Sequence, residues 1–233
     1  MSQKSRSAKP MISLTYDGAQ FCHAETALPH LDTNQLKATF FIDPLNMLET
    51  LPIWVEASRN GHEIGNGCLT YCGPIDAWTA EMVADDLDEC DSLIREAFPG
   101  QQLFSFGYPT STGNAYGIDY LKRIIEKKHL VCRSGDQGGN NFDQINLAYL
   151  NCITLDGQTG DQLIDIVRSA VRTYDYTILA FDGIGSGDPS IDASAHLTLC
   201  QWLKQSQDLV QTMTVSGAAQ AIRQAGKPEL KLV

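Results

Sequence analysis

Short apolar segments alternate with amphipathic helical segments along almost the whole chain. The clearest strand pattern covers residues 176–181, where strand-forming residues run directly into Asp182 and Gly183. The longest helical pattern covers residues 79–98, where apolar residues recur at helical spacing. Strands that alternate with helices pair in parallel through right-handed crossovers, so this pattern predicts an α/β fold.

The same patterns locate the other elements. Strands are expected at residues 12–16, 38–42, around Ile64, and at 103–107, 130–133, 147–150 and 209–214. Helices are expected at residues 25–32, 51–59, 116–128, 160–174, 194–206 and 216–225. Polar residues follow many of the strands, as on the top face of a barrel. No Gly-x-Gly-x-x-Gly pattern opens a helix after the first strand, which weakens the case for a dinucleotide-binding fold. The sequence therefore predicts a closed or nearly closed (β/α) barrel of seven to eight mostly parallel strands.

One domain accounts for the chain. Its 233 residues, 43% of them hydrophobic, suffice for one sizeable core. We expect a flexible segment at residues 1–10, a single barrel domain at 11–225 and a tail at 226–233. The first ten residues lack the apolar core of a secretory signal, and no run of about 18 apolar residues predicts a membrane span. Seven cysteines, an odd number, do not suit a disulfide framework and indicate a reducing, cytoplasmic location.

The charge balance excludes one class of partner. The formal net charge is −11, from 28 acidic and 17 basic residues. Contacts with phosphates require a basic face, so neither a nucleic acid nor an anionic membrane is expected as the main partner. The densest acidic stretch, residues 81–91, is interpreted as the solvated face of a helix.

Two aspartates stand at the ends of predicted strands. Asp17 ends the first strand and Asp182 follows the strand at residues 176–181. Each has two interpretations, a residue that begins a glycine turn or a carboxylate that points into a pocket as a base or metal ligand. The tight Gly183-Ile184-Gly185 loop favours the functional interpretation for Asp182.

A few other polar and thiol side chains are weaker candidates. His62 precedes the strand around Ile64 and is either a hydrogen-bonded structural residue or part of a binding site. Cys68 and Cys72 are close enough in sequence to hold a soft metal with His62 or Asp17, although no paired Cys-x-x-Cys knuckle occurs.

Tyr108 and Asn114 flank the strand at residues 103–107. Both are candidates for lining a sugar or small-molecule pocket, and both equally suit a turn aromatic and a loop amide.

Several of these motifs together resemble a known family. They are Thr-Tyr-Asp-Gly at residues 15–18, Leu-Lys-Ala-Thr-Phe-Phe at 36–41, Gly-His-Glu-Ile-Gly-Asn at 61–66, Tyr-Pro at 108–109 and Phe-Asp-Gly-Ile-Gly at 181–185. Their order and spacing resemble those of the polysaccharide deacetylases, the NodB-homology enzymes of carbohydrate esterase family 4. The resemblance covers residues 11–223. It implies a distorted (β/α) barrel whose members remove acetyl groups from sugars with a divalent metal.

The resemblance fails at the residues that would carry this chemistry. The family has two consecutive aspartates where this chain has only Asp17, which matches either the base or the metal-binding aspartate. The two metal-binding histidines fall at Gly67 and Tyr71. The arginine that orients the base falls at Gly107, and the histidine that acts as general acid falls at Asp182.

These departures leave three hypotheses open. The first is a polysaccharide-deacetylase-like protein that is catalytically impaired and keeps a cleft for a carbohydrate or another small molecule, with no cofactor. The second is an active hydrolase of carbon–nitrogen or ester bonds that uses Asp17 and Asp182, with zinc or another divalent metal only if Cys68, Cys72 or His62 rebuilds the metal site. The third is a non-enzymatic interaction scaffold, with homo-oligomerisation as one form of it.

Overall fold

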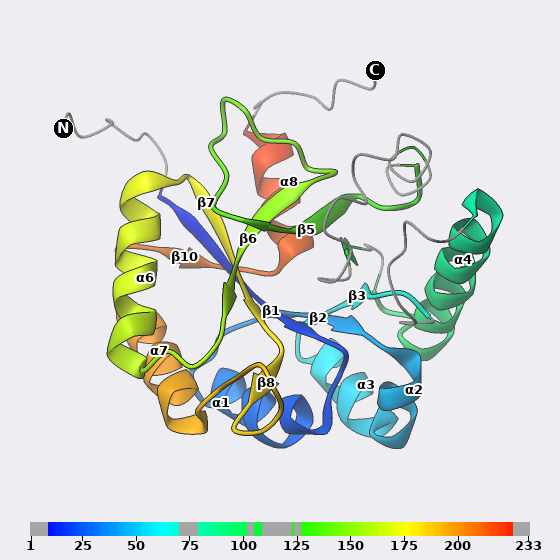
Figure 1. Ribbon diagram of the computed structural model, residues 1–233, viewed down its shortest axis with the longest axis horizontal. Coiled ribbons are helices and arrows are strands. Elements are labelled where there is room, and N and C mark those ends of the chain that lie inside the picture. The colour runs from blue at the N-terminus through cyan, green and yellow to red at the C-terminus, as the bar shows by residue number, and fades with distance from the viewer. Residues whose placement is uncertain (1–8, 70–78, 102–104, 109–122, 124–126, 226–233) are drawn as a thin grey trace.

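The fold is a closed barrel of parallel strands with helices around it (Figure 1). The computed structural model describes residues 9–69, 79–101, 105–108, 123 and 127–225. The barrel strands are β1 (Met11–Asp17), β2 (Thr39–Ile42), β3 (Glu63–Asn66), β4 (Ser105–Gly107), β5 (Val131–Gln137), β6 (Leu150–Leu155) and β7 (Tyr176–Phe181). They pair in sequence order, and β1 pairs with β7 to close the barrel. This confirms the predicted parallel barrel.

Helices surround the strands. They are η1 (His23–Ala27), α1 (Leu28–Thr33), α2 (Pro44–Glu49), α3 (Leu51–Arg59), α4 (Ala80–Ala97), α6 (Gly160–Thr173), α7 (Ala193–Gln205) and α8 (Val215–Gln224). A short extra strand, β10 (Gln211–Thr212), pairs with the start of β1, and β8 (Gly183–Ile184) pairs with β9 (Ser190–Ile191) beyond the end of β7. None of the described helices is both long and apolar enough to cross a membrane.

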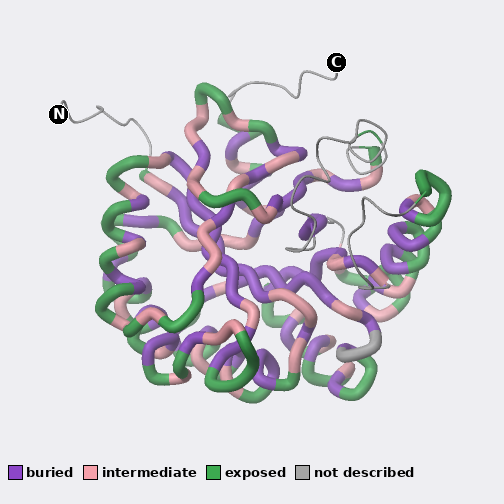
Figure 2. Tube along the Cα trace, in the orientation of Figure 1, coloured by how far each residue is buried: buried purple, intermediate pink, exposed green. Residues whose placement is uncertain are grey.

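The alternation of side chains along β1 separates the core from the site. Every residue of β1 before Asp17 is buried, as in a parallel strand that is covered on both faces (Figure 2). The ring of Tyr16 stacks between those of Phe40 and Phe181, its partners on the adjacent strands, at centroid distances of 4.9 and 5.1 Å. These rings belong to the large core packed under α1, α3 and α7. Successive side chains point to opposite faces of a strand, so Asp17 faces the barrel interior.

The predicted elements agree with the structure where the apolar pattern is strong. The strands expected at 12–16, 38–42 and 176–181 and the helices expected at 51–59 and 160–174 are present. The prediction was wrong between residues 134 and 155. The expected strands at 130–133 and 147–150 are instead β5, which continues to Gln137, and β6, which begins at Leu150. The pairing of the two strands is irregular between Arg133 and Gln137, and Ser134 Oγ donates a hydrogen bond to the Leu150 carbonyl there.

Candidate functional site

A small cavity lies where several barrel strands end. Its volume is about 210 Å³, and its lining is drawn from the carboxyl ends of β1, β2, β3, β4 and β7, from the loops that follow them, and from Arg133 near the start of β5. The lining residues are Asp17, Gly18, Gln20, Phe41, Asp43, Gly67, Gly107, Tyr108, Arg133 and Asp182. We call this cavity the Asp17 pocket. It brings together three of the side chains predicted from sequence, Asp17, Asp182 and Tyr108.

Asp17 is held by an arginine from another strand. The Nη2 atom of Arg133, on β5, donates to both carboxylate oxygens of Asp17, at 2.8 and 2.9 Å. Arg133 is only 1% exposed, and 16% of the Asp17 side chain remains exposed toward the pocket. A buried guanidinium requires a counter-charge, and Asp17 supplies it.

The environment moves both predicted carboxyl groups toward neutrality. Burial raises the pKa of Asp17 from 3.8 to about 6, against the opposing effect of Arg133, and the nearby Asp182 adds to the rise. Burial also raises the pKa of Asp182, with a further contribution from Asp156, while Arg133 again opposes the shift. Two carboxyl groups with raised pKa values in one cavity are typical of a functional site.

A buried histidine, His23, connects the loop that follows β1 to the loop that contains Asp182. The Nδ1 atom of His23, in η1, accepts a hydrogen bond from the Gln20 backbone N–H at 3.2 Å, which places the proton on Nε2. Nε2 then donates to the backbone carbonyl of Asp182. Burial lowers the pKa of His23 to about 4, so the ring stays neutral at physiological pH. His23 therefore fixes the Asp182 loop against the loop that follows β1.

The position of the family's first histidine has no room for a side chain. A Cβ atom added to Gly67 would lie 2.7 Å from the backbone carbonyl oxygen of Ile42 and 3.1 Å from the carbonyl carbon of Phe41. Backbone atoms of a barrel strand cannot shift cheaply to relieve such a contact. The close approach of these two chain segments therefore requires glycine at residue 67.

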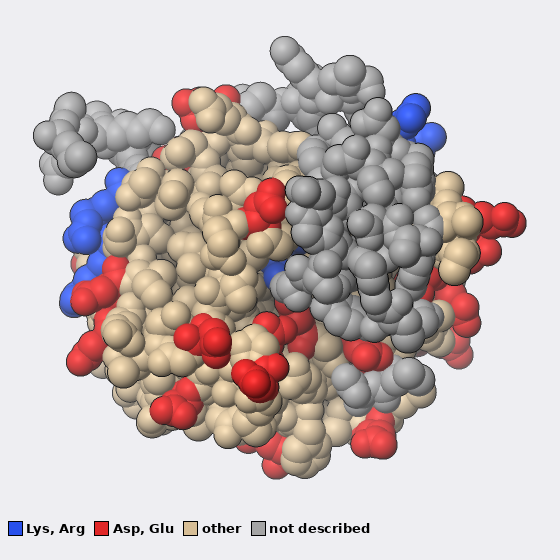
Figure 3. All heavy atoms as spheres, in the orientation of Figure 1, with Lys and Arg blue, Asp and Glu red and all other residues tan. Residues whose placement is uncertain are grey.

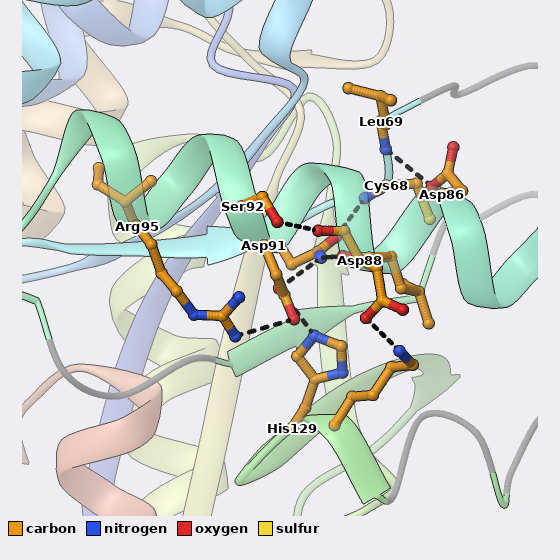
Figure 4. A network of polar contacts seen from close by, with 12 residues as sticks. Cys68, Leu69, Asp86, Asp88, Asp91, Ser92, Arg95 and His129 are labelled. Atoms are coloured by element: carbon orange, nitrogen blue, oxygen red, sulfur yellow. Dashed lines mark hydrogen bonds and ion pairs between the residues drawn. The ribbon is translucent and has the colours of Figure 1, made fainter.

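The loop after β3 is fixed by carboxylates of α4 (Figure 4). Asp91 accepts hydrogen bonds from Asn66 Nδ2 at 2.8 Å and His129 Nε2 at 3.2 Å, and Asp86 accepts one from the Leu69 backbone N–H at 2.9 Å. Asp86 and Asp91 are both buried. The interpretation of residues 81–91 as a solvated face was therefore wrong for these two residues, because the backbone and side-chain donors of the β3 loop satisfy their charges.

His62 lies at the other end of the barrel. It immediately precedes β3, whereas the Asp17 pocket lies at the carboxyl ends of the strands. Its Nδ1 atom accepts from the Ala38 backbone N–H at 3.3 Å, and its Nε2 atom lies 3.1 Å from Asp32 Oδ1. His62 also borders a larger, open cavity of about 910 Å³ that shares no lining residue with the Asp17 pocket.

The structure does not bring Cys68 into the Asp17 pocket. Cys68 is 2% exposed, and burial raises the pKa of its thiol, helped by the neighbouring Asp86 and Cys90 on α4. Its backbone N–H donates to Asn66 Oδ1 at 2.9 Å. Cys72, Asn114 and Tyr71 lie outside the described residues.

Sequence reasoning missed three residues of this site. Asp43 follows β2 directly, so the rule that selected Asp17 and Asp182 would also have found it. His23 lies within a helical segment and carried no distinguishing signal. Arg133 is the last residue of the strand expected at 130–133, and nothing in the local sequence connects it to Asp17.

The described donor atoms do not fit the metal that the family resemblance implies. Zinc favours imidazole and thiolate ligands in protein sites, yet the described lining of the pocket supplies carboxylates without imidazole or thiol. Both oxygens of Asp17 are already bonded to Arg133. Across the described chain, no three His, Cys, Asp or Glu side chains form a group that could hold a metal ion.

Known proteins place these observations in context. The family model for polysaccharide deacetylase matches residues 4–124, and no curated protein matches the chain. A family 4 acetyl xylan esterase from Clostridium thermocellum, solved with a cobalt ion, is similar with a TM-score of 0.65 and 20% identity over 94% of this chain and 93% of that chain. A carbohydrate esterase family 4 pseudoenzyme from Bacillus anthracis has a TM-score of 0.61 and 15% identity over 92% of this chain and 66% of that one. A mutant of that pseudoenzyme with restored enzymatic activity is equally similar, with a TM-score of 0.61 and 15% identity over 92% and 69% of the two chains.

Proposed function

Because the chain belongs to the polysaccharide deacetylase family, we propose that it binds a carbohydrate or a similar small polar ligand in the Asp17 pocket and lacks the family's metal-dependent deacetylation. The proposal rests on the packing at two positions. Gly67 and Gly107 stand where the family has a metal-binding histidine and an arginine. A Cβ atom at either position would lie 2.7 Å from atoms of the adjoining β2 segment. The family's catalytic side chains therefore cannot occupy this pocket as it is packed.

The lining of the pocket supports a polar ligand. The carboxylates of Asp17, Asp43 and Asp182 are acceptors for hydroxyl groups, and the rings of Phe41 and Tyr108 supply apolar surface. The volume of about 210 Å³ is small for a ligand cavity. It suits a single sugar ring or a substituent better than several residues of a polymer.

One observation favours a second function, a hydrolase that works without the family's metal. The pKa of Asp17 is raised to about 6, which is close to the value of an effective general base at neutral pH. Asp182, whose pKa is also raised, lies in the same pocket and is available as an acid. In this alternative, Asp17 would take a proton from water while Asp182 donates one to the leaving group.

A binding experiment separates the two functions. We expect N-acetyl-chitooligosaccharides or acetylated xylo-oligosaccharides to change the NMR signals of Asp17, Gly18 and Asp182 without release of acetate. Asp182→Asn should weaken this binding, whereas Asp165→Asn, at a side chain that is 76% exposed on α6, should leave it unchanged. Acetate release that disappears in Asp17→Asn would favour the hydrolase. If neither class of sugar perturbs the pocket, the binding proposal is wrong.

A further inference from the structure

Arg133 is unusual among the residues of the barrel strands. It is a 1% exposed cation on β5, and its guanidinium has two side-chain hydrogen-bond acceptors, the Asp17 carboxylate, bonded through Nη2, and the thiol of Cys152. Its Nε and Nη1 atoms are buried without an oxygen acceptor. Burying a guanidinium in this way is costly, because desolvation offsets most of the Coulomb gain.

Residue 107 lies directly beside Arg133. Gly107, the last residue of β4, is the register partner of Arg133 on the adjacent parallel strand. Partner residues on neighbouring strands point to the same face of the sheet, so a side chain at residue 107 would enter the space that Arg133 uses. A Cβ atom at Gly107 would lie 3.0 Å from Arg133 Nη2 and 2.7 Å from Phe41 Cγ.

The guanidinium fills the space that Gly107 leaves open. Its Cζ atom lies over the ring of Phe41, at 5.0 Å from the ring centroid, so the cation and the ring pack against each other above this glycine. The backbone supports the same arrangement, because the N–H of Tyr108 donates to the Arg133 carbonyl at 2.8 Å. An arginine at residue 107 therefore has no room while Arg133 and Phe41 hold their present positions.

We propose that Arg133 is the positioning residue for Asp17, and that it performs from β5 the task that the family resemblance assigns to an arginine at residue 107. The guanidinium that orients the Asp17 carboxylate thus comes from β5 instead of the adjacent β4. Glycine at residue 107 leaves the space for it. This identifies Asp17 with the family's base rather than with its metal-binding aspartate, because the base is the carboxylate that the arginine orients. The inference does not depend on which ligand the pocket binds.

Arg133 keeps Asp17 available as an acceptor near neutral pH. Among the described residues, the charged or titratable groups around Asp17 are Arg133, the carboxylates of Asp43 and Asp182, the phenol of Tyr108 and the thiol of Cys152 on β6. Burial raises the pKa of that thiol, so it is neutral at physiological pH. Arg133 is then the group that opposes burial and the neighbouring Asp182, so its loss should raise the pKa of Asp17 further.

A carboxyl titration followed by carbon-13 NMR tests this role in the full chain. In Arg133→Met we expect the pKa of Asp17 to rise above its wild-type value by about 1 to 3 units. Arg133→Lys keeps the charge and should give a smaller rise. Arg168→Met, at an exposed arginine paired with Asp165, should leave the pKa of Asp17 unchanged.

The second test moves the arginine from residue 133 on β5 to residue 107 on β4. Gly107→Arg alone should lower the melting temperature sharply, whereas Gly107→Arg combined with Arg133→Gly should be more stable than the sum of the two single variants predicts. In the double variant, the pKa of Asp17 should return toward about 6. This arm remains decisive if Arg133→Met does not fold.

Two results would overturn the inference. One is a folded Arg133→Met protein in which Asp17 titrates as in the wild type. The other is additive destabilisation in the double variant with no recovery of the pKa. Both are independent of sugar binding, so failure of the proposed function would not produce them.

Discussion

Replacing Gly67 with alanine is expected to lower the free energy of unfolding by about 2 to 3 kcal/mol, although only one methyl group is added. The reason is the 2.7 Å approach of the new Cβ atom to the Ile42 carbonyl oxygen. Neither partner in this contact is a flexible side chain, so relief requires β2 and the loop after β3 to separate. Chemical denaturation of the two proteins measures the difference directly.

The matched control for this substitution is Gly100→Ala. A Cβ atom at Gly100 would meet nothing within 4 Å, so we expect a change within about 0.5 kcal/mol. Gly67→His should be at least as destabilising as Gly67→Ala and should not create a zinc site. A Gly67→His protein as stable as the wild type would show that the loop has room, and the argument from packing would fail.

Replacing Asp91 with alanine is expected to cost about 1 to 3 kcal/mol, because it leaves the buried donors of Asn66 and His129 without their acceptor. Asp91 is 2% exposed and bonds Asn66 and His129, with Arg95 at 3.7 Å (Figure 4). Burial alone would raise the pKa of Asp91, but hydrogen bonds from His129 and Asn66 together with the charge of Arg95 lower it. Thermal or chemical unfolding measures the loss.

Asp88→Ala is the control on the same helix. Asp88 pairs with Lys128 and is 64% exposed, so its loss should cost less than about 1 kcal/mol. Because Asn66 directly precedes Gly67, Asp91→Ala should also alter the NMR signals of the Asp17 pocket, whereas Asp88→Ala should not. Equal effects of the two substitutions would show that the buried network does not hold the β3 loop.

The alternation of strands and helices was sufficient to predict the barrel, and the ends of strands were sufficient to predict its carboxylates. Residues 12–16 could be assigned because strand-forming residues alternate there, and residues 176–181 because strand formers follow one another almost without a break. Asp17 and Asp182 could be selected because such strands end at one face of a barrel.

The remaining features depend on contacts between segments that are distant in sequence. Arg133 orients Asp17 only because residue 107, on the neighbouring strand, is glycine. Asp86 and Asp91 look like members of a solvated acidic face until the donors of the β3 loop are placed against them. Local composition cannot distinguish a buried, paired charge from an exposed one.

The overall charge is consistent with a ligand other than nucleic acid. Acidic side chains are distributed over the face shown in Figure 3, as the net charge of −11 requires. A net negative charge disfavours the binding of phosphate polymers and has no such effect on neutral sugars.

The most direct test of the central claim is the metal content of the full chain. The protein would be purified without chelator, incubated with zinc or cobalt, dialysed and analysed by elemental mass spectrometry beside Asp17→Asn. We predict that the wild type retains no more metal than the variant, because the Asp17 carboxylate is already bonded to Arg133 and residue 67 offers no ligand. Close to one metal ion per wild-type chain, lost in Asp17→Asn, would contradict the account and show that the pocket is a metal site.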